Sequence, residues 1–328
     1  MARPSARSTI RLGTRGGALA LWQAREVARL IAATHPQVAS DIRIIRTTGD
    51  REQSAPIAEI GGTGVFTREI EHALKAGAID LAVHSLKDLP TRTADGLTLA
   101  SILERADPRD ALAAPSGTTL AGLRPGARIG TSSSRRRAQL LAHRPDLVMI
   151  EVRGNVPTRL AKLDRGDYEA IVLACAGLQR LGLGDRVAEV FEPEVVMPAP
   201  GQGAIAVEAR ADDAWLLDLL QALDHRPTRL ATAAERACLA GLDGGCLAPV
   251  GALGRWSGDV LTLAATVTAE RGTPALRERL ETRVLTEADA EAAGRQLADL
   301  LVRQGAGALI GALRRPPRGS RPAPTDTP

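Results

Sequence analysis

Short apolar runs alternate with amphipathic segments along the first third of the chain. Strand-like runs occupy residues 9–13, 41–47, 79–85 and 97–103. After the first run, Leu19, Trp22 and Val27 begin a helical spacing of apolar residues that continues to about residue 35. The run at 79–85 is typical of a strand in a buried parallel sheet. The pattern therefore predicts a βα domain.

The same pattern restarts after the polar segment 104–110. Further strand-like runs lie at residues 127–130, 147–152 and 169–175. The segment 197–203, rich in proline and glycine, is typical of a hinge, and residues 204–210 are predicted to form a strand that returns to the first domain. Two βα domains joined by two crossovers would form a cleft on which their strand ends converge.

The last third of the chain has a different pattern. A helix is predicted over residues 228–242, and alternating runs at 250–255, 260–268 and 276–284 predict an antiparallel sheet. Thr286 caps a final amphipathic helix. The expected domains are residues 1–104 with 203–224, residues 105–202, residues 225–313, and a disordered, proline-rich tail at 314–328.

Composition is that of a soluble globular protein. Of the 328 residues, 44% are hydrophobic and 24% are charged, and no run approaches the roughly 18 apolar residues that span a membrane. No apolar stretch follows Arg3 and Arg7, so we expect no signal peptide and a cytoplasmic protein. Three widely spaced cysteines fit a reducing compartment, and the cysteines and histidines lack the spacing of metal ligands, so no metal site is expected.

Arginine dominates the basic residues. Lys75, Lys87 and Lys162 are the only lysines among 42 basic residues. The planar guanidinium is the bidentate partner of carboxylates and phosphates. Codon preference explains much of this count, but not the clustered positions described below. Aromatic residues make up only 2% of the chain, which argues against the stacking platforms of a nucleic-acid-binding protein.

One thiol lies in a glycine-rich loop after the helix predicted at 228–242. Residues 242–251 read LDGGCLAPVG, and Pro249 ends any helix there. Two glycines allow backbone conformations that other residues avoid, so the loop presents Cys246 more openly than a helix or strand would. The loop alone leaves two interpretations open, an accessible reactive thiol and a small buried turn residue.

A lysine and an aspartate follow the strand predicted at residues 79–85. Ser85, Lys87 and Asp88 stand at its carboxyl end. Ligands of open α/β sheets bind outside the carboxyl ends of the strands, so Asp88 is a candidate for chemistry. A solvated turn is the alternative interpretation.

Successive arginines open a helix predicted after residue 130. Thr131 and Ser133 can cap its first N–H groups, whereas Arg135, Arg136 and Arg137 oppose the helix dipole. The cluster therefore indicates an anion site, with one functional and two solvated arginines as the alternative. Other arginines in or after predicted βα turns are Arg15, Arg153, Arg159 and Arg180.

Ordered motifs across residues 10–313 resemble the porphobilinogen deaminase (hydroxymethylbilane synthase) family. They are TRG at 14–16, AVHSLKDLP at 82–90, DPRD at 107–110, GTSS at 130–133, RGNV at 153–156, GQGA at 201–204, ER at 235–236 and GGC at 244–246. The resemblance implies an α/β fold with two periplasmic-binding-protein-like βα domains around a cleft. It also implies a small α+β C-terminal domain with a three-stranded antiparallel sheet.

The resemblance further implies a transferase that joins four porphobilinogen molecules into hydroxymethylbilane and releases four ammonia molecules. It assigns Cys246 the thioether to a dipyrromethane cofactor and Asp88 the catalytic carboxylate, which stabilises the azafulvene cation of each incoming ring. Cofactor-binding roles fall on Ser85, Lys87, Thr131, Ser133, Arg135 and Arg136. Substrate-binding roles, mostly toward ring carboxylates, fall on Arg15, Arg153, Arg159, Arg180 and Gln202.

Some features depart from the family pattern or leave alternatives open. Thr63 replaces a common lysine in a glycine-rich loop, and Glu59 is acidic where a basic residue is common, so a lid role for that loop is open. A solute-binding protein or ligand-binding regulator shares the cleft but gives Cys246 no role. A catalytically inactive scaffold is opposed by the intact Asp88 and Cys246. We expect a monomer without nucleic-acid or membrane partners, and uroporphyrinogen-III synthase is a candidate downstream partner.

Overall fold

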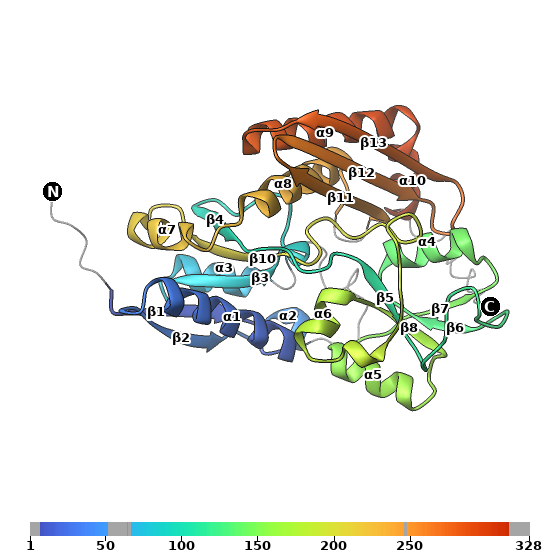
Figure 1. Ribbon diagram of the computed structural model, residues 1–328, viewed down its shortest axis with the longest axis horizontal. Coiled ribbons are helices and arrows are strands. Elements are labelled where there is room, and N and C mark those ends of the chain that lie inside the picture. Colours follow the sequence, from blue (N-terminus) through green and yellow to red (C-terminus); the bar gives the residue numbers. More distant parts are fainter. Residues whose placement is uncertain (1–6, 52–63, 65–66, 246–247, 315–328) are drawn as a thin grey trace, which may run out of the picture.

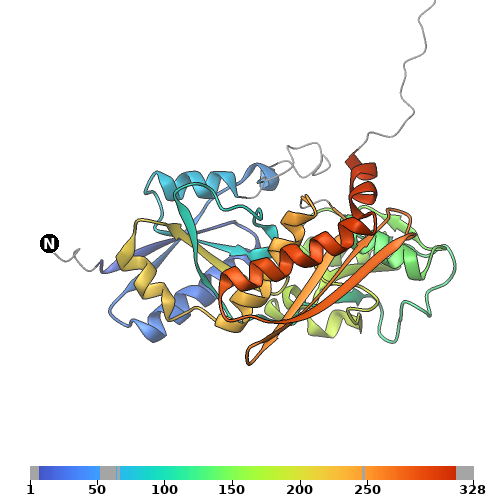
Figure 2. The same ribbon diagram turned by 90° about the horizontal axis from the view of Figure 1, so that it is seen from above.

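The computed structural model describes residues 7–51, 64, 67–245 and 248–314 of the chain. Its elements form three β-sheets with helices packed on their faces (Figure 1). The first sheet (blue to cyan, with β10 in yellow) and the second sheet (green) lie next to each other, and the third (orange) lies across them (Figure 2). The strands of each sheet come from one of the three units expected from the sequence. The exact boundaries of these units remain predictions.

The first sheet has the strand order β2-β1-β3-β10-β4. Its strands are β1 (Thr9–Thr14), β2 (Ala39–Ile44), β3 (Leu81–Ser85), β4 (Leu97–Ile102) and β10 (Ile205–Arg210). β1 runs parallel to β2 and β3, whereas β10 runs antiparallel to β3 and β4. The predicted return of the chain to the first sheet is confirmed.

Helices cover both faces of the first sheet. They are α1 (Ala18–Thr34), α3 (Arg68–Lys75) and α7 (Ala214–Gln221), and the short α2 (Thr48–Arg51) follows β2. Val27 of α1 and Leu216 of α7 pack with Leu12 and Val207 on one face. Leu74 of α3 closes the opposite face. Burial on both faces explains why the strand at 81–85 is apolar over most of its length.

The second sheet repeats this arrangement with the order β7-β6-β8-β5-β9. Its strands are β5 (Asp110–Ala113), β6 (Arg128–Gly130), β7 (Val148–Ile150), β8 (Ala170–Ala174) and β9 (Val187–Val190). Its helices are α4 (Ser134–His143), α5 (Val156–Asp164), α6 (Cys175–Arg180) and the 3₁₀ turn η2 (Gly184–Arg186). Leu140 of α4 packs on one face, and Leu160 of α5 and Leu178 of α6 pack on the other.

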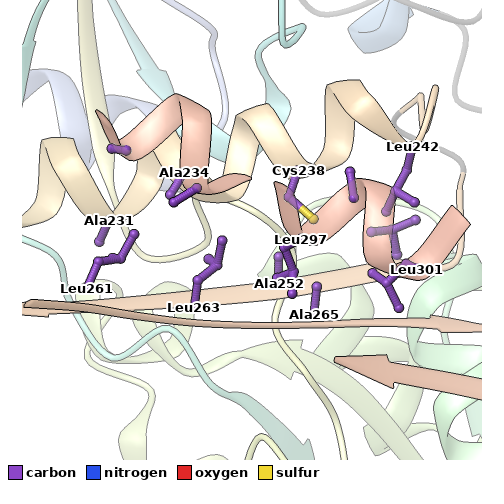
Figure 3. Packing of buried hydrophobic residues seen from close by; sticks show 14 of the residues in the cluster. Ala231, Ala234, Cys238, Leu242, Ala252, Leu261, Leu263, Ala265, Leu297 and Leu301 are labelled. Carbon is purple, nitrogen blue, oxygen red and sulfur yellow. The ribbon is translucent and has the colours of Figure 1, made fainter. Parts of the chain in front are cut away.

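The third sheet is antiparallel, with the order β11-β12-β13. Its elements are α8 (Arg226–Gly241), β11 (Val250–Ser257), β12 (Val260–Thr268), β13 (Ala275–Arg283), α9 (Glu287–Arg303) and α10 (Ala306–Arg314). Figure 3 shows side chains of α8, among them Cys238, packed against β12 and against Leu297 and Leu301 of α9. A Cβ on Gly294 would collide with the Ala234 carbonyl, so this glycine permits the close approach of the two helices.

One buried carboxylate joins the third unit to the crossovers between the first two. Glu235 of α8 is fully buried and accepts both Nη groups of Arg105, which follows β4. It also accepts the backbone N–H groups of Gly201 and Gly254, each at 2.7 Å. Four donors therefore satisfy a charge that would be costly if buried alone.

The structure confirms the predicted fold class and corrects several details. Residue 110, expected to end a polar crossover, begins β5, and β9, α7 and α10 are elements that the sequence pattern did not mark. Cys175, expected on a strand, is the first residue of α6. Arg314, expected to begin the tail, ends α10, and residues 315–328 lie outside the described residues. Within the described ranges, no helix is long and apolar enough to cross a membrane.

Candidate active site

The carboxyl end of β3 continues into the 3₁₀ turn η1 (Leu86–Asp88). The turn is fixed at both ends, because the Leu86 N–H donates to the Ala204 carbonyl at 3.0 Å and the Leu89 N–H donates to Leu86 at 3.2 Å. Gly201, at φ +74°, approaches Leu86 so closely that a Cβ would lie 2.9 Å from its Cγ. The side chains between these anchors are Lys87, which is half-buried, and Asp88, which is exposed.

Lys87 points into the crossover region. Its Nζ donates to Oε1 of Gln202 at 3.2 Å, and Gln202 is fully buried. Burial and the charge of Arg136 lower the pKa of Lys87 to about 8, with the charges of Asp88 and Asp110 opposing this shift. With this lowered pKa, Lys87 is close to losing its proton, and an anionic ligand bound beside it would favour the charged form.

The arginines at the start of α4 surround a buried aspartate. Arg135 donates to Oδ2 of Asp110 at 2.7 Å, and Arg136 donates to Oδ1 through Nη2 at 2.6 Å and Nε at 3.0 Å. The Gln202 amide donates to the same Oδ1 at 2.9 Å. Burial alone would raise the pKa of Asp110, but the charges of Arg135 and Arg136 hold it well below its usual range. The Asp110 carboxylate is therefore an anion within the protein that balances the arginine charges at the start of α4.

Hydroxyl groups shape the turn before α4. Ser133 is the N-cap, and its Oγ accepts the N–H of Arg136 at 3.4 Å. Thr131 Oγ1 accepts the N–H of Ser133 at 3.2 Å, and Ser132 Oγ donates to the Val152 carbonyl at 2.6 Å. These bonds fix the direction in which α4 leaves the sheet.

A second group of arginines lies on α5 and α6. Nε of Arg159 donates to the Gly154 carbonyl at 2.8 Å, and Arg180 donates to the Gly203 carbonyl at 2.7 Å. Arg180 also lies over the ring of Trp22 on α1, 5.5 Å from its centroid, and so connects α6 to the first sheet's helices. Within the described part of the chain, neither Arg159 nor Arg180 forms an ion pair.

Burial destabilises the charges of this second group. It lowers the pKa of Arg159 to about 10, where the neighbouring charges of Arg136 and Arg153 act in the same direction and that of Asp88 opposes them. Burial likewise lowers the pKa of Arg180 to about 10. Both groups remain protonated at neutral pH, so they are partly buried cations suited to binding anions.

A cavity of about 380 Å³ lies between the η1 turn, the start of α4, the hinge and the end of α8. Lys87, Arg92, Arg135 and Arg236 contribute cationic groups to its wall. Its other lining residues include Gly244, Gly245 and Ala248, on either side of residues 246–247. Its volume falls within the ~300–1,000 Å³ of small-molecule sites. Asp243 is the one acidic residue among the described lining residues, so positive charge is in excess. The cavity therefore suits an anionic ligand of modest size beside the segments that flank Cys246.

Comparison with known proteins identifies the family. The model for "Porphobilinogen deaminase, dipyromethane cofactor binding domain" matches residues 10–218, and the model for the porphobilinogen deaminase C-terminal domain matches residues 229–303. The chain belongs to the porphobilinogen deaminase family. Porphobilinogen deaminase from Roseiflexus sp. is 49% identical over 93% of this chain and 99% of its own, and that from Desulforudis audaxviator is 48% identical over 94% and 99%.

Solved structures similar to this chain include a periplasmic substrate-binding protein of an ABC transporter from Coxiella burnetii. It is 19% identical, covers 69% of this chain and 96% of its own, and has a TM-score of 0.41. A putative methionine-binding lipoprotein from Bacillus subtilis is 11% identical, with coverage of 68% and 92% and a TM-score of 0.40.

The residues of the cavity fit the dipyrromethane cofactor of the porphobilinogen deaminase family. The cofactor carries carboxylates, and the cavity wall presents several cationic side chains beside the segments that flank Cys246. Cys246 itself lies outside the described residues, as do Thr63 and Glu59. The remaining described cysteines, Cys175 and Cys238, are buried, and burial raises the pKa of each thiol to about 12.

The structure brings only some of the predicted site residues together. Lys87, Ser133 and Arg135 line the cavity, and Gln202 and Arg136 connect to them through Asp110. Ser85 instead hydrogen-bonds Gln23 of α1, at 2.9 Å from the amide nitrogen. Arg15 and Arg153 are half-buried near the starts of α1 and α5.

Sequence reasoning did not identify Asp110, Arg92 or Arg236 as site residues. Asp110 belongs to the DPRD motif. The adjacent charges of Arg135 and Arg136 at a helix start indicated that an anion must lie near them, but the sequence did not show that Asp110 supplies it. Arg236 belongs to the ER motif, and no pattern along the chain shows that it reaches the residues after Asp88.

Proposed function

We propose that this protein is a hydroxymethylbilane synthase that joins four porphobilinogen molecules head to tail and releases four ammonia molecules. Its primer is a dipyrromethane attached through a thioether to Cys246. One observation carries the proposal in a chain of this family. The cation-lined cavity lies between the turn that carries Lys87 and the segments that flank Cys246.

Asp88 is the proposed catalytic residue. Its carboxylate is exposed at the carboxyl end of β3, and its charge acts on Lys87 and Arg159. A carboxylate at this position stabilises the positive charge that develops on porphobilinogen as ammonia leaves, and it can accept a proton from the new ring afterwards. When bound, the dipyrromethane supplies the pyrrole end to which substrate rings are joined.

The cationic residues divide the work of binding. Lys87, Arg135 and Ser133 border the cavity and are the proposed contacts of the cofactor, with Ser85, Thr131 and Arg136 in supporting positions. Gln202 orients Lys87 through its amide oxygen. The proposed ligands of substrate carboxylates are Arg15, Arg153, Arg159 and Arg180. Charge-assisted bonds of this kind fix both the position and the direction of each ring.

We also propose that the enzyme works as a monomer in the cytoplasm. Burial keeps Cys175 and Cys238 protonated at neutral pH, which suits thiols that do not crosslink or react. The downstream partner, uroporphyrinogen-III synthase, stays a prediction.

Turnover of porphobilinogen tests the proposed function. Purified protein should consume porphobilinogen and release one ammonia per molecule consumed, with hydroxymethylbilane as the first product. A solute-binding protein or an inactive relative would bind porphobilinogen and release no ammonia, and that result would overturn the proposal.

A further inference from the structure

Arg236 of α8 reaches across to the segment that follows the η1 turn. Its Nη2 donates to the carbonyl of Pro90 at 2.7 Å and to that of Thr91 at 3.1 Å. Its Nη1 donates to the carbonyl of Leu89 at 3.4 Å. One guanidinium therefore holds three successive backbone carbonyls directly after Asp88.

These carbonyls belong to neither a helix nor a strand. Backbone carbonyls outside regular structure need donors from elsewhere, and the five N–H groups of a guanidinium suit this task. On the other side of the turn, the Leu86 N–H is bound to the Ala204 carbonyl. The short segment that carries Lys87 and Asp88 is thus fixed by β3 and the Ala204 carbonyl on one side and by Arg236 on the other.

The helix that supplies Arg236 also leads to the segment that flanks Cys246. α8 ends at Gly241, and Asp243, Gly244 and Gly245 line the same cavity as Arg236. A single helix therefore contacts the turn of the catalytic carboxylate and carries the chain to the cofactor's attachment point.

We propose that Arg236 is a positioning residue that acts through Asp88. By holding the carbonyls of residues 89–91, it fixes the backbone that carries Asp88 relative to α8, the helix that leads to the segment before Cys246. The inference rests on the proposed function, since it assumes that Asp88 acts on rings joined to a cofactor on Cys246.

Arg229 offers a matched control on the same helix. It donates to the carbonyls of Leu99 and Ala100 of β4, each at 3.1 Å, and pairs with Asp224 at 2.8 Å. Arg229 therefore also attaches α8 to the backbone of the first sheet, but at a strand away from the η1 turn. A loss that is merely structural should be similar for the two arginines.

The experiment compares the wild-type holoenzyme with Arg236→Gln, Arg236→Lys and Arg229→Gln. Intact mass gives the fraction carrying the cofactor, single-turnover kinetics give the rate of first-ring addition in that fraction, and steady-state kinetics separate kcat from KM. Arg236→Gln should slow first-ring addition by about 10²-fold with little change in KM, because a displacement of about 1 Å can cost that much. Arg236→Lys should recover part of the rate, and Arg229→Gln should add the ring at the wild-type rate.

Three results would overturn the inference. Equal rates in the loaded Arg236→Gln and Arg229→Gln proteins would reduce Arg236 to a structural contact. A folded Arg236→Gln protein without cofactor would make Arg236 a ligand of the cofactor instead. If Arg236→Gln does not fold, the Lys variant decides, and a wild-type rate there refutes the proposal. A wild-type protein with neither cofactor nor turnover would instead refute the proposed function.

Discussion

Two aspartates of this protein lie among cationic side chains but have opposite surroundings. Asp110 is fully buried and accepts hydrogen bonds from Arg135, Arg136 and Gln202. Asp88 is exposed on the η1 turn, and no hydrogen bond or ion pair among the described residues holds its carboxylate. Its charge nevertheless acts on Lys87 and Arg159.

This difference separates a carboxylate that stabilises the fold from one that can serve a reaction. The bonds of Asp110 are already made within the protein, so its arginines are arranged before any ligand arrives. The Asp88 carboxylate makes no such bond with a described residue, so it is available to a cation that forms beside it. The comparison also separates Arg135 and Arg136, which form ion pairs with Asp110, from Arg159 and Arg180, which form no ion pair with any described residue.

Replacing Asp110 should have the largest effect on stability. Asp110→Asn removes the charge that Arg135 and Arg136 share, and leaving buried charges uncompensated typically costs 3–5 kcal/mol, so we expect roughly that loss. Urea denaturation measures the change. Asp107→Asn in the same motif is the control, because its partner Arg109 is partly exposed and such pairs contribute about 0–1 kcal/mol. Equal, small losses in both variants would contradict the assigned role of Asp110.

Replacing Asp88 should change the rate and spare the fold. Asp88→Asn keeps the shape and removes the charge, so first-ring addition in cofactor-carrying protein should slow on the order of 10²–10³-fold. Substrate affinity should change far less, because other groups hold the ring carboxylates. Asp88→Glu keeps the charge and should retain some activity. A wild-type rate for Asp88→Asn in single-turnover kinetics would make Asp88 a structural turn residue.

The sequence predicted the parts of this comparison that depend on local pattern. The strand that ends before Lys87 and the helix that begins with Arg135 and Arg136 follow from apolar runs and capping residues. The pairing of Asp110 with these arginines could not be predicted, because it depends on how β5, β8 and α4 meet in space. Short edge strands such as β9 were missed because four half-buried residues give little periodicity.

Replacing Arg159 should weaken substrate binding with little loss of stability. Within the described residues Arg159 has no ion pair, and burial lowers its pKa, so Arg159→Met removes a cation and, toward the fold, the hydrogen bond from Nε to the Gly154 carbonyl. A lost charge-assisted bond is worth about 1.5–3 kcal/mol, so KM should rise by roughly 10- to 150-fold. The exposed Arg165→Met, at the residue that follows the C-terminal end of α5, is the control. Lower stability with an unchanged KM would place Arg159 with the structural arginines.

The protonation of Lys87 should give a smaller, pH-dependent effect. Its folded pKa of about 8 lies below its ordinary value of 10.5, so the folded protein binds fewer protons than the unfolded chain between these values. The burial of the Lys87 charge therefore lowers the stability of the folded protein fully below pH 8, and this loss is relieved as the pH rises toward 10.5.

The same loss of charge should affect cofactor binding. Uptake of cofactor by cofactor-free protein should slow as the pH rises through 8. Lys87→Arg should remove that step, and an identical profile in both proteins would show that Lys87 does not contribute.

Intact mass most directly tests the claim that Cys246 carries the cofactor. The wild-type protein should exceed its sequence mass by two pyrrole units, and Cys246→Ser should have the sequence mass alone. Cys175→Ser and Cys238→Ser should keep the excess, because both thiols are buried and Cys238 points into the core of the third unit (Figure 3). An active wild-type protein without added mass, or an excess lost on replacing Cys238 and retained in Cys246→Ser, would contradict the account.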